Sequence, residues 1–104
     1  MKELTDAEFD DFIKNNELVI IDFWAEWCGP CKMVAPTFEA LSKDYEGKVA
    51  FAKLDTMANE QTPAKFGVAS IPNFIVFRNG EQIGSIVGAM LKPDFKRKLD
   101  EIIE

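Results

Sequence analysis

The chain has 104 residues, of which 47% are hydrophobic, so it fits one folded domain over residues 1–104 and is not a disordered tail. Its formal net charge is −6, which argues against nucleic-acid binding because phosphate contacts need a cationic surface. It contains no histidine, so this chain alone offers neither an imidazole metal site nor a Ser-His or Cys-His catalytic pair.

The sequence carries no sign of export or membrane insertion. Met1 is followed directly by the largely polar segment 2–6, with no apolar stretch of the signal-peptide type. No apolar run approaches the roughly 18 residues that a membrane span requires. Two cysteines are also too few for the disulfide framework of a small secreted fold. We therefore expect a cytoplasmic protein, in a compartment where thiols are mostly kept reduced.

The first two predicted elements are a helix and a strand. The helix begins at Thr5, which can form a capping box with Glu8, and it ends at residues 15–16. Residues 18–24 are branched and aromatic and apolar on both faces, which is typical of a central strand covered on both sides. Residues 1–4 are too short for an edge strand to be predicted.

The middle of the chain predicts a helix, a strand and a second, shorter helix. Residues 31–45 have apolar residues at helical spacing, and Pro36 should kink this helix because proline cannot donate a backbone hydrogen bond. Residues 49–54 predict a second central strand. Residues 59–66 predict the shorter helix, which ends at Gly67.

The last third predicts a strand hairpin followed by a helix. Residues 73–78 and 82–87 are the strands, and Asn79-Gly80 between them is a strong signal for a type I′ turn. Pro93 fits the first turn of the final helix. The predicted order is helix, strand, helix, strand, helix, strand, strand, helix. It indicates an α/β fold with parallel strands, helices on both faces and an antiparallel hairpin at one edge.

Both cysteines lie in the segment Trp27-Cys28-Gly29-Pro30-Cys31, where the first central strand gives way to a helix. Sites in parallel α/β sheets form at the carboxyl ends of strands, and two intervening residues let the sulfurs meet across one turn. We expect Cys28 to face outward at the helix start and Cys31 to lie one turn inside. The free N–H groups of the helix would stabilise a thiolate at Cys28, which is the form that attacks disulfides.

Three interpretations of this motif compete. Redox exchange is the first. A zinc or iron–sulfur site is the second, but such a site needs four ligands, so two thiols would require a dimer. The third is that the cysteines are two buried packing residues. The position of the motif between a strand and a helix favours redox exchange.

Charged residues interrupt both central strands. Asp22 lies in the apolar run of the first, so we expect a partly neutral or paired carboxyl whose pKa is raised by desolvation. The alternative is a strand-end residue that reaches water or caps a neighbouring turn. Lys53 lies in the second strand and can pair with Asp22 if the strands are neighbours. The alternative for Lys53 is an exposed strand end.

Several segments together resemble the thioredoxin family. They cover the whole chain in the family's order, and the tryptophan-flanked cysteine motif with a later Ile-Pro and Val-Gly-Ala is very specific. The segments are residues 23–32 followed by Pro36, 52–55, 71–72, 77–80 and 87–89. The resemblance implies the thioredoxin fold, a central mixed four- to five-stranded sheet with helices on both faces. It also implies a thiol–disulfide oxidoreductase that reduces protein disulfides.

The resemblance implies a role for each residue of the catalytic set. Cys28 would attack a substrate disulfide to form a mixed disulfide. Cys31 would then attack Cys28, release the reduced substrate and leave a Cys28–Cys31 disulfide. Asp22 would take up and return the proton of Cys31, with Lys53 tuning it. The redox-active disulfide belongs to the chain itself, so we expect no separate cofactor and no metal.

The resemblance also implies a flat apolar docking surface beside the cysteines. Ile71-Pro72 matches the family's cis-proline loop, which faces the cysteines and pairs its backbone with the substrate. From the residues alone, Trp27 could equally be a core residue and Gly88 a plain turn. Asn73 stands where the family usually carries threonine, which could alter substrate preference. The expected docking residues are Trp27, Gly29, Pro30, Ile71, Pro72, Gly88 and Ala89.

The expected partners are target proteins that contain disulfides and, as electron donor, a flavoprotein thioredoxin reductase using NADPH. We expect a monomer that binds neither nucleic acid nor membrane. The Gly29-Pro30 pair between the cysteines resembles the reducing branch of the family. Two alternatives are a disulfide oxidase or isomerase and a non-catalytic thioredoxin-fold protein partner.

Overall fold

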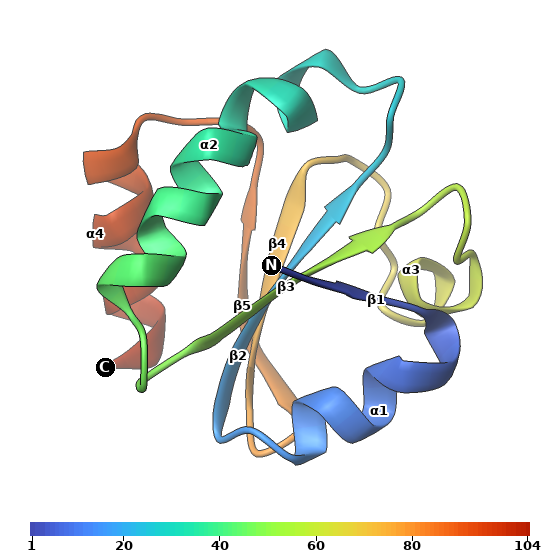
Figure 1. The fold of residues 1–104 in the computed structure, drawn as a ribbon, viewed down its shortest axis with the longest axis horizontal. Helices are drawn as coiled ribbons and strands as arrows, with labels where there is room; N and C mark the ends of the chain where they lie inside the picture. Colours follow the sequence, from blue (N-terminus) through green and yellow to red (C-terminus); the bar gives the residue numbers. More distant parts are fainter.

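Five strands form one mixed sheet, and four helices cover its two faces (Figure 1). The computed structural model describes residues 1–104. In chain order the elements are β1 (Lys2–Leu4), α1 (Asp6–Lys14), β2 (Leu18–Trp24), α2 (Gly29–Asp44), β3 (Ala50–Asp55), α3 (Gln61–Lys65), β4 (Asn73–Arg78), β5 (Glu81–Val87) and α4 (Lys92–Ile103). The strand order across the sheet is β1-β3-β2-β4-β5.

The central position of β2 follows from its sequence. All of its residues except Trp24 are buried, which matches its nearly continuous apolar run. β2 pairs in parallel with β3 and antiparallel with β4, and β5 pairs antiparallel with β4. α2 and α4 lie on one face of the sheet, and α1 and α3 lie on the other (Figure 1). The predicted α/β architecture with an antiparallel hairpin at one edge is confirmed.

Alternate residues of β2 point to opposite faces and contribute to two separate cores. Ile20 belongs to the core beneath α2 and α4, together with Phe38 and Phe95, whose ring centroids are 6.2 Å apart. Ile21 belongs to the core beneath α1 and α3, together with Phe9. Because both faces are covered, the strand shows no alternation of polar and apolar residues.

Helix α2 begins two residues earlier than the predicted start at residue 31. Cys28 takes the N-cap position, and Gly29 and Pro30 form the first turn. The N–H groups of a first turn have no helical partners, so proline costs little there and the turn leaves no helical pattern in the sequence. Pro36 lies inside the helix, as predicted.

Helix α3 is shorter than the predicted segment 59–66. The side chain of Asn59 accepts a hydrogen bond from the N–H of Asp6 and donates one to the carbonyl oxygen of Asp55, which holds it outside the helix. The Asp6 carboxylate in turn accepts hydrogen bonds from the first two backbone N–H groups of α3. This cap comes from α1, so the local sequence could not reveal it.

The two edges of the sheet add one unpredicted strand and one confirmed turn. β1 pairs in parallel with β3 and is anchored by the buried side chain of Leu4. At the other edge, Asn79 and Gly80 have φ of 51° and 83°, as a type I′ turn requires. The last strand therefore begins at Glu81, directly after this turn.

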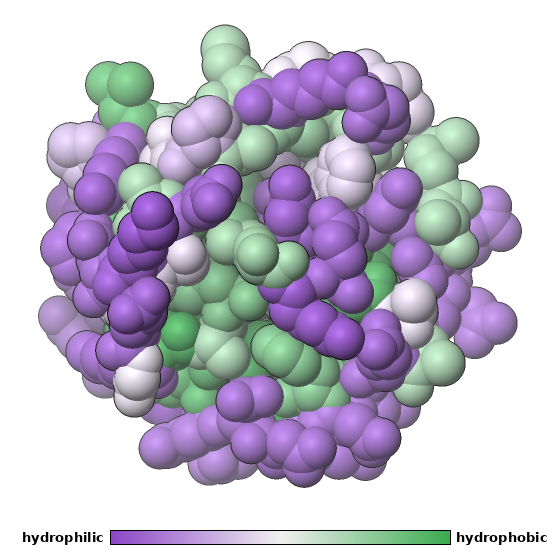
Figure 2. Space-filling model, viewed as in Figure 1, coloured by the Kyte–Doolittle hydropathy of each residue, from purple (hydrophilic) through white to green (hydrophobic).

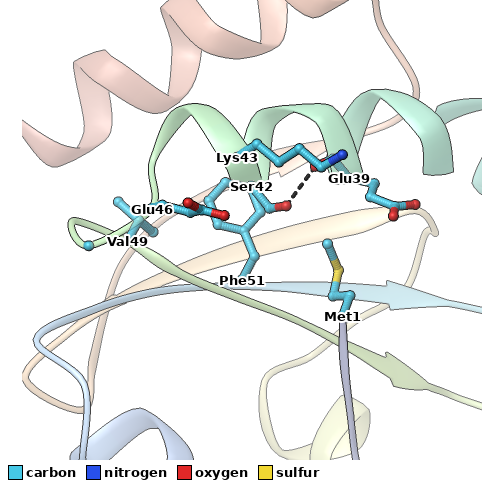
Figure 3. A pocket seen from close by; sticks show the side chains of 8 residues that line it. Met1, Glu39, Ser42, Lys43, Glu46, Val49 and Phe51 are labelled. Atoms are coloured by element: carbon cyan, nitrogen blue, oxygen red, sulfur yellow. Dashed lines mark hydrogen bonds between the residues drawn. The ribbon is translucent and has the colours of Figure 1, made fainter.

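Hydrophilic side chains cover most of the face that carries the N-terminus, with an apolar recess among them (Figure 2). A cavity of about 370 Å³ lies here between the N-terminus and the carboxyl half of α2 (Figure 3). Its lining residues are Met1, Glu39, Ser42, Lys43, Glu46, Gly47, Val49 and Phe51. Charge along a sheet edge discourages pairing with another chain. None of the helices combines the length and the apolar character needed to cross a membrane.

Candidate redox site

The two cysteines lie where the carboxyl end of β2 meets the amino end of α2. Cys28 and Cys31 are joined by a disulfide, and their Cα atoms are 5.3 Å apart. Cys28 is the N-cap of α2 with an extended backbone, and Cys31 lies in the first turn. The predicted placement of both sulfurs across one turn is confirmed.

Two backbone polar groups lie close to the sulfur of Cys28. Its Sγ accepts a hydrogen bond from the N–H of Cys31 at 3.2 Å and lies 3.8 Å from the carbonyl oxygen of Ile71. An N–H donor and the positive end of a helix both favour a thiolate at this position once the disulfide is reduced. The prediction that Cys28 faces outward is wrong, because Cys28 is only 3% exposed and Cys31 is 2% exposed. Trp24 and Ile71 pack against the pair and cover it.

Asp22 is completely buried in β2, on the face that α2 covers. Neither of its carboxylate oxygens has a hydrogen-bond partner. Burial raises the pKa of Asp22 to about 7, although the charge of Lys53 lowers that pKa and the charge of Glu3 raises it further. The predicted carboxyl with a raised pKa is confirmed, and the alternative of a strand-end residue that reaches water is wrong.

Lys53 is the neighbour of Asp22 across the β2–β3 pair, but the two form no ion pair. Their Cα atoms are register partners, yet both Asp22 oxygens are unpaired. The Lys53 ammonium lies over the ring of Trp24, 4.7 Å from its centroid. Lys53 also lines a shallow cavity of about 220 Å³ together with Glu3. The long lysine stem places the ammonium where it keeps contact with water. The predicted direct pair is therefore wrong. The charge of Lys53 lowers the pKa of Asp22 through space, without an ion pair.

The loop before β4 lies against the cysteines. The Ile71-Pro72 peptide bond is cis, as the resemblance implied, and the Ile71 carbonyl oxygen is the one near Cys28. The carbonyl oxygen of Pro72 accepts a hydrogen bond from the N–H of Gly88 at 2.9 Å. Gly88 has φ of 94°, a conformation that favours glycine. The structure thus brings three of the expected docking residues together beside the disulfide.

Comparison with known proteins agrees with this geometry. The family model described as Thioredoxin matches residues 1–101. The chain belongs to the thioredoxin family. A thioredoxin of Staphylococcus saprophyticus is 49% identical to it over 102 residues, covering 98% of this chain and 93% of that protein. A thioredoxin of Staphylococcus aureus is 46% identical to it over 99 residues, covering 95% of this chain and 94% of that protein. A solved structure of Plasmodium falciparum thioredoxin matches with a TM-score of 0.90 and 41% sequence identity. The match covers 97% of this chain and 98% of that one.

Membership of the thioredoxin family establishes the chemistry of the cysteine pair. The chain has the thioredoxin fold and is a thiol–disulfide oxidoreductase of the thioredoxin type, with Cys28 and Cys31 as its redox pair. The predicted family, fold and activity are confirmed. The structure assembles no group of three or more His, Cys, Asp or Glu side chains that could hold a metal ion.

The remaining expected docking residues of this thioredoxin lie at or near the surface. Trp27 is 69% exposed, so the alternative of a core residue is wrong. Gly29, Pro30 and Ala89 are also exposed. Asn73, the residue that departs from the family pattern, is half-buried, and its Oδ1 atom has no hydrogen-bond partner.

Two residues that contact the tryptophans beside the cysteines, Thr56 and Met57, were not among those predicted from the sequence. The N–H and hydroxyl of Thr56 donate to the carbonyl oxygen of Trp24 at 2.9 and 3.0 Å. The Sδ atom of Met57 accepts a hydrogen bond from the indole N–H of Trp27 at 3.3 Å. Both residues directly follow β3, so their position at the carboxyl edge of a parallel sheet is the signal that could have identified them.

Proposed function

We propose that this thioredoxin reduces protein disulfides, with Cys28 as the nucleophile and Cys31 as the resolving thiol. The observation that carries the proposal is the sulfur pair at the amino end of α2, the helix that covers a buried carboxyl in β2 with a pKa of about 7. Residues 1–104 work as one thioredoxin domain, and the domain works as a monomer. The match of the family model to residues 1–101 supports the single domain.

The proposed cycle begins from the dithiol form. The Cys28 thiolate attacks one sulfur of the substrate disulfide, and the other substrate sulfur leaves as a thiolate that takes up a proton. Cys31 then attacks the Sγ atom of Cys28, and the bond between Cys28 and the substrate breaks. The substrate leaves with two thiols, and the chain is left with the Cys28–Cys31 disulfide after giving up two electrons.

Asp22 is the proposed acceptor of the Cys31 proton. A free thiol has a pKa of about 8.5, so a base with a pKa of about 7 is better matched to it than an ordinary carboxylate. The carboxyl is buried beneath the helix that carries Cys31, and the proton would pass between the two groups through water. Lys53 tunes this base, because its positive charge lowers the pKa of Asp22 against the larger effect of burial.

The proposed docking surface is the apolar rim around the disulfide. The substrate backbone lies along the loop at Ile71-Pro72. The carbonyl oxygen of Ile71 already lies 3.8 Å from the Sγ atom of Cys28. Trp27 and Pro30 offer exposed apolar surface on the side of α2, and Gly88 with Ala89 completes the rim beside the loop. Asn73 modifies substrate preference because it directly follows this loop. Trp27 is 69% exposed and lines one surface pocket together with Ile71, which supports the assignment because contiguous exposed apolar surface marks an interaction site.

A flavoprotein thioredoxin reductase that uses NADPH is the proposed electron donor, and the cytoplasm is the proposed location. Each cycle leaves the chain as a disulfide, so two electrons must arrive before the next substrate can be reduced. The support for this donor is the high identity to bacterial proteins named thioredoxin.

The test is to trap the covalent intermediate with single cysteine variants. In Cys31→Ser the nucleophile remains and the resolving thiol is missing, so the variant should accumulate a mixed disulfide between Cys28 and a protein disulfide. Cys28→Ser should accumulate none, and mass spectrometry of the adduct locates the bond. Adducts on Cys31 of the Cys28→Ser variant, with none in Cys31→Ser, would reverse the two roles.

The reduction potential decides the direction of the reaction. The potential is measured by equilibrating the cysteine pair against thiol redox buffers and following the fluorescence of Trp24 and Trp27. A potential well below that of glutathione supports the reductase, whereas one at the oxidising end indicates an oxidase or isomerase. Retention of the cellular role by the double variant Cys28→Ser/Cys31→Ser would indicate a non-catalytic partner.

A further inference from the structure

One contact beside the disulfide joins two exposed side chains from distant parts of the chain. The indole Nε1–H of Trp27 donates to the Sδ atom of Met57 at 3.3 Å. Trp27 is 69% exposed and Met57 is 64% exposed. The backbone N–H of Met57 is held by the Asp55 carboxylate at 2.9 Å, so the loop that presents the sulfur is anchored to the end of β3.

The thioether of Met57 is open to oxidants in solution. A thioether sulfur has two lone pairs, and the hydrogen bond from Trp27 uses one of them. The other has no hydrogen-bond partner, on a side chain that is mostly exposed. Met33, on the outer face of α2, is 73% exposed and Met1 is 50% exposed, but no hydrogen bond reaches the sulfur of either. Met57 is therefore the exposed methionine whose oxidation changes a contact of the docking surface.

We propose that Met57 is an oxidation site through which hydroperoxides weaken the docking of substrates beside Trp27. The O–O bond of the hydroperoxide breaks, one oxygen atom forms an S=O bond with Sδ, and the peroxide leaves as water or an alcohol. The sulfur loses two electrons, and the peroxide gains them. Methionine sulfoxide is a substrate of methionine sulfoxide reductases, so the change is reversible.

The sulfoxide changes the surface in two ways. Its oxygen is a stronger hydrogen-bond acceptor than a thioether, so it holds the indole N–H of Trp27 more tightly. The sulfoxide oxygen also has a further lone pair, which the single indole N–H of Trp27 leaves without a hydrogen-bond donor. Water fills that site in the free protein, and an apolar partner would have to displace this water. The effect on catalysis rests on the proposed docking role of Trp27.

The experiment treats the disulfide form with hydrogen peroxide, because the Cys28–Cys31 bond protects both sulfurs. Peptide mass spectrometry then measures the oxidised fraction of each methionine. KM and kcat for a protein disulfide are compared before and after treatment in the wild type, in Met57→Leu and in the matched control Met33→Leu. The indole N–H resonances of Trp27 and Trp24 are followed by NMR, with Trp24 as the internal reference.

In the wild type and Met33→Leu, oxidation should raise KM about fivefold with little change in kcat, the effect of placing one unsatisfied polar atom under an apolar partner. In Met57→Leu the ratio of KM after to before oxidation should stay near one. The Trp27 indole resonance should shift in the wild type, and that of Trp24 should not.

Three results would overturn the proposal. One is the same rise in KM in Met57→Leu, and another is complete oxidation of Met57 with neither a rise in KM nor a shift of the Trp27 resonance. The third is oxidation of Met33 under conditions that leave Met57 intact. If the untreated protein reduces no protein disulfide, the proposed function fails separately, and the Trp27 resonance alone then decides whether the sulfoxide forms this contact.

Discussion

At the scale of single residues, Asp22 shows how burial prepares a side chain for chemistry. The carboxyl has no hydrogen-bond partner and is fully buried, so the charged form loses its hydration, and the charge of Lys53 offsets only part of that loss. The result is a pKa of about 7. A group that would be permanently ionised at the surface therefore titrates in the range where a thiol must lose its proton.

The same burial makes stability depend on pH. In the folded state Asp22 has a pKa of about 7, and its ordinary value is 3.8. Between these values the folded state binds one proton more than the unfolded state, so the free energy of unfolding falls as pH rises from about 4 to about 7. Above pH 7 the loss is complete, at roughly 4 kcal/mol.

Replacing Asp22 tests this linkage. Asp22→Asn should be close to wild type in stability at pH 4 and more stable by about 2–4 kcal/mol at pH 8, because the amide never ionises. Urea unfolding of the disulfide form at both pH values measures the difference. The control is Asp11→Asn, which removes an exposed carboxylate of α1 and should leave the pH dependence unchanged. A wild-type protein that gains stability between pH 4 and pH 8 relative to Asp22→Asn would contradict the expected direction of the pH dependence.

At the scale of elements, helix α4 approaches strand β5 so closely that one position of the strand needs glycine. A Cβ atom at Gly84 would lie 2.9 Å from Cγ2 of Ile102 and 3.1 Å from two further atoms of the same side chain. Glycine inside a strand often marks such a close approach. Ile102 packs against the core beneath α2 and α4, so the helix cannot simply move outward.

Gly84→Ala should therefore destabilise the protein by about 1–3 kcal/mol, although alanine alone suits a strand better than glycine. The measurement is urea unfolding, and the same substitution is made in an Ile102→Ala background, where the clashing atoms are absent. The cost of Gly84→Ala should largely vanish there. A matched control is Gly29→Ala, where a Cβ atom would meet nothing within 4 Å. Equal losses in both backgrounds would show that the contact with Ile102 is not the cause.

The carboxyl end of α2 is tied to α4 by a polar cluster. The hydroxyl of Tyr45 donates a short hydrogen bond to Asp100, and the Lys96 ammonium donates to the Tyr45 oxygen at 3.2 Å. The Lys96 ammonium also lies over the Tyr45 ring, 4.7 Å from its centroid. The hydrogen bond from Tyr45 is the largest cause of the lowered pKa of Asp100.

Tyr45→Phe should keep the ring contacts and lose the hydroxyl, at a cost of about 1–2 kcal/mol for a hydrogen bond to a charged group. A double-mutant cycle with Asp100→Asn isolates the pair, and its coupling energy should be similar in size. NMR titration of Asp100 should show a higher pKa in Tyr45→Phe than in the wild type. Additive losses in the cycle would mean that the two side chains do not interact.

At the scale of the whole molecule, the disulfide links redox state to folding. The folded chain holds the two cysteines at the junction of β2 and α2, with Cα atoms 5.3 Å apart. Closing this loop in the unfolded chain removes conformational freedom that the folded chain has already given up. In the chain-entropy view, a loop of this length stabilises the folded state by about 2 kcal/mol.

The disulfide form should therefore unfold at a higher urea concentration than the dithiol form. Measurement at pH 5 keeps Asp22 mostly protonated in the folded protein, so the comparison isolates the disulfide. We expect a difference of about 2 kcal/mol. The double variant Cys28→Ser/Cys31→Ser is the control, because a reductant should not change its stability. Equal stability of the two wild-type forms would contradict the entropic account.

Much of this molecule could be predicted from the sequence because the relevant signals are local. The apolar run 18–24 predicted a doubly covered strand, and Asn79-Gly80 predicted the turn. The spacing of Cys28 and Cys31 predicted a sulfur pair across one helical turn. Asp22 was conspicuous because a carboxylate is costly in an apolar strand. Each of these signals depends on neighbours within a few residues.

The sequence by itself determined the order of elements from α1 onward, the closeness of the two cysteines and the burial of Asp22, because periodicity and spacing act within a single element. Only the tertiary structure decided where the Lys53 ammonium goes, how closely α4 covers β5 and which sulfur meets the Trp27 indole. These contacts join residues that the sheet order brings together from distant positions, such as Trp27 and Met57. Their geometry depends on strand register and side-chain rotamers, which are set by packing across the whole molecule.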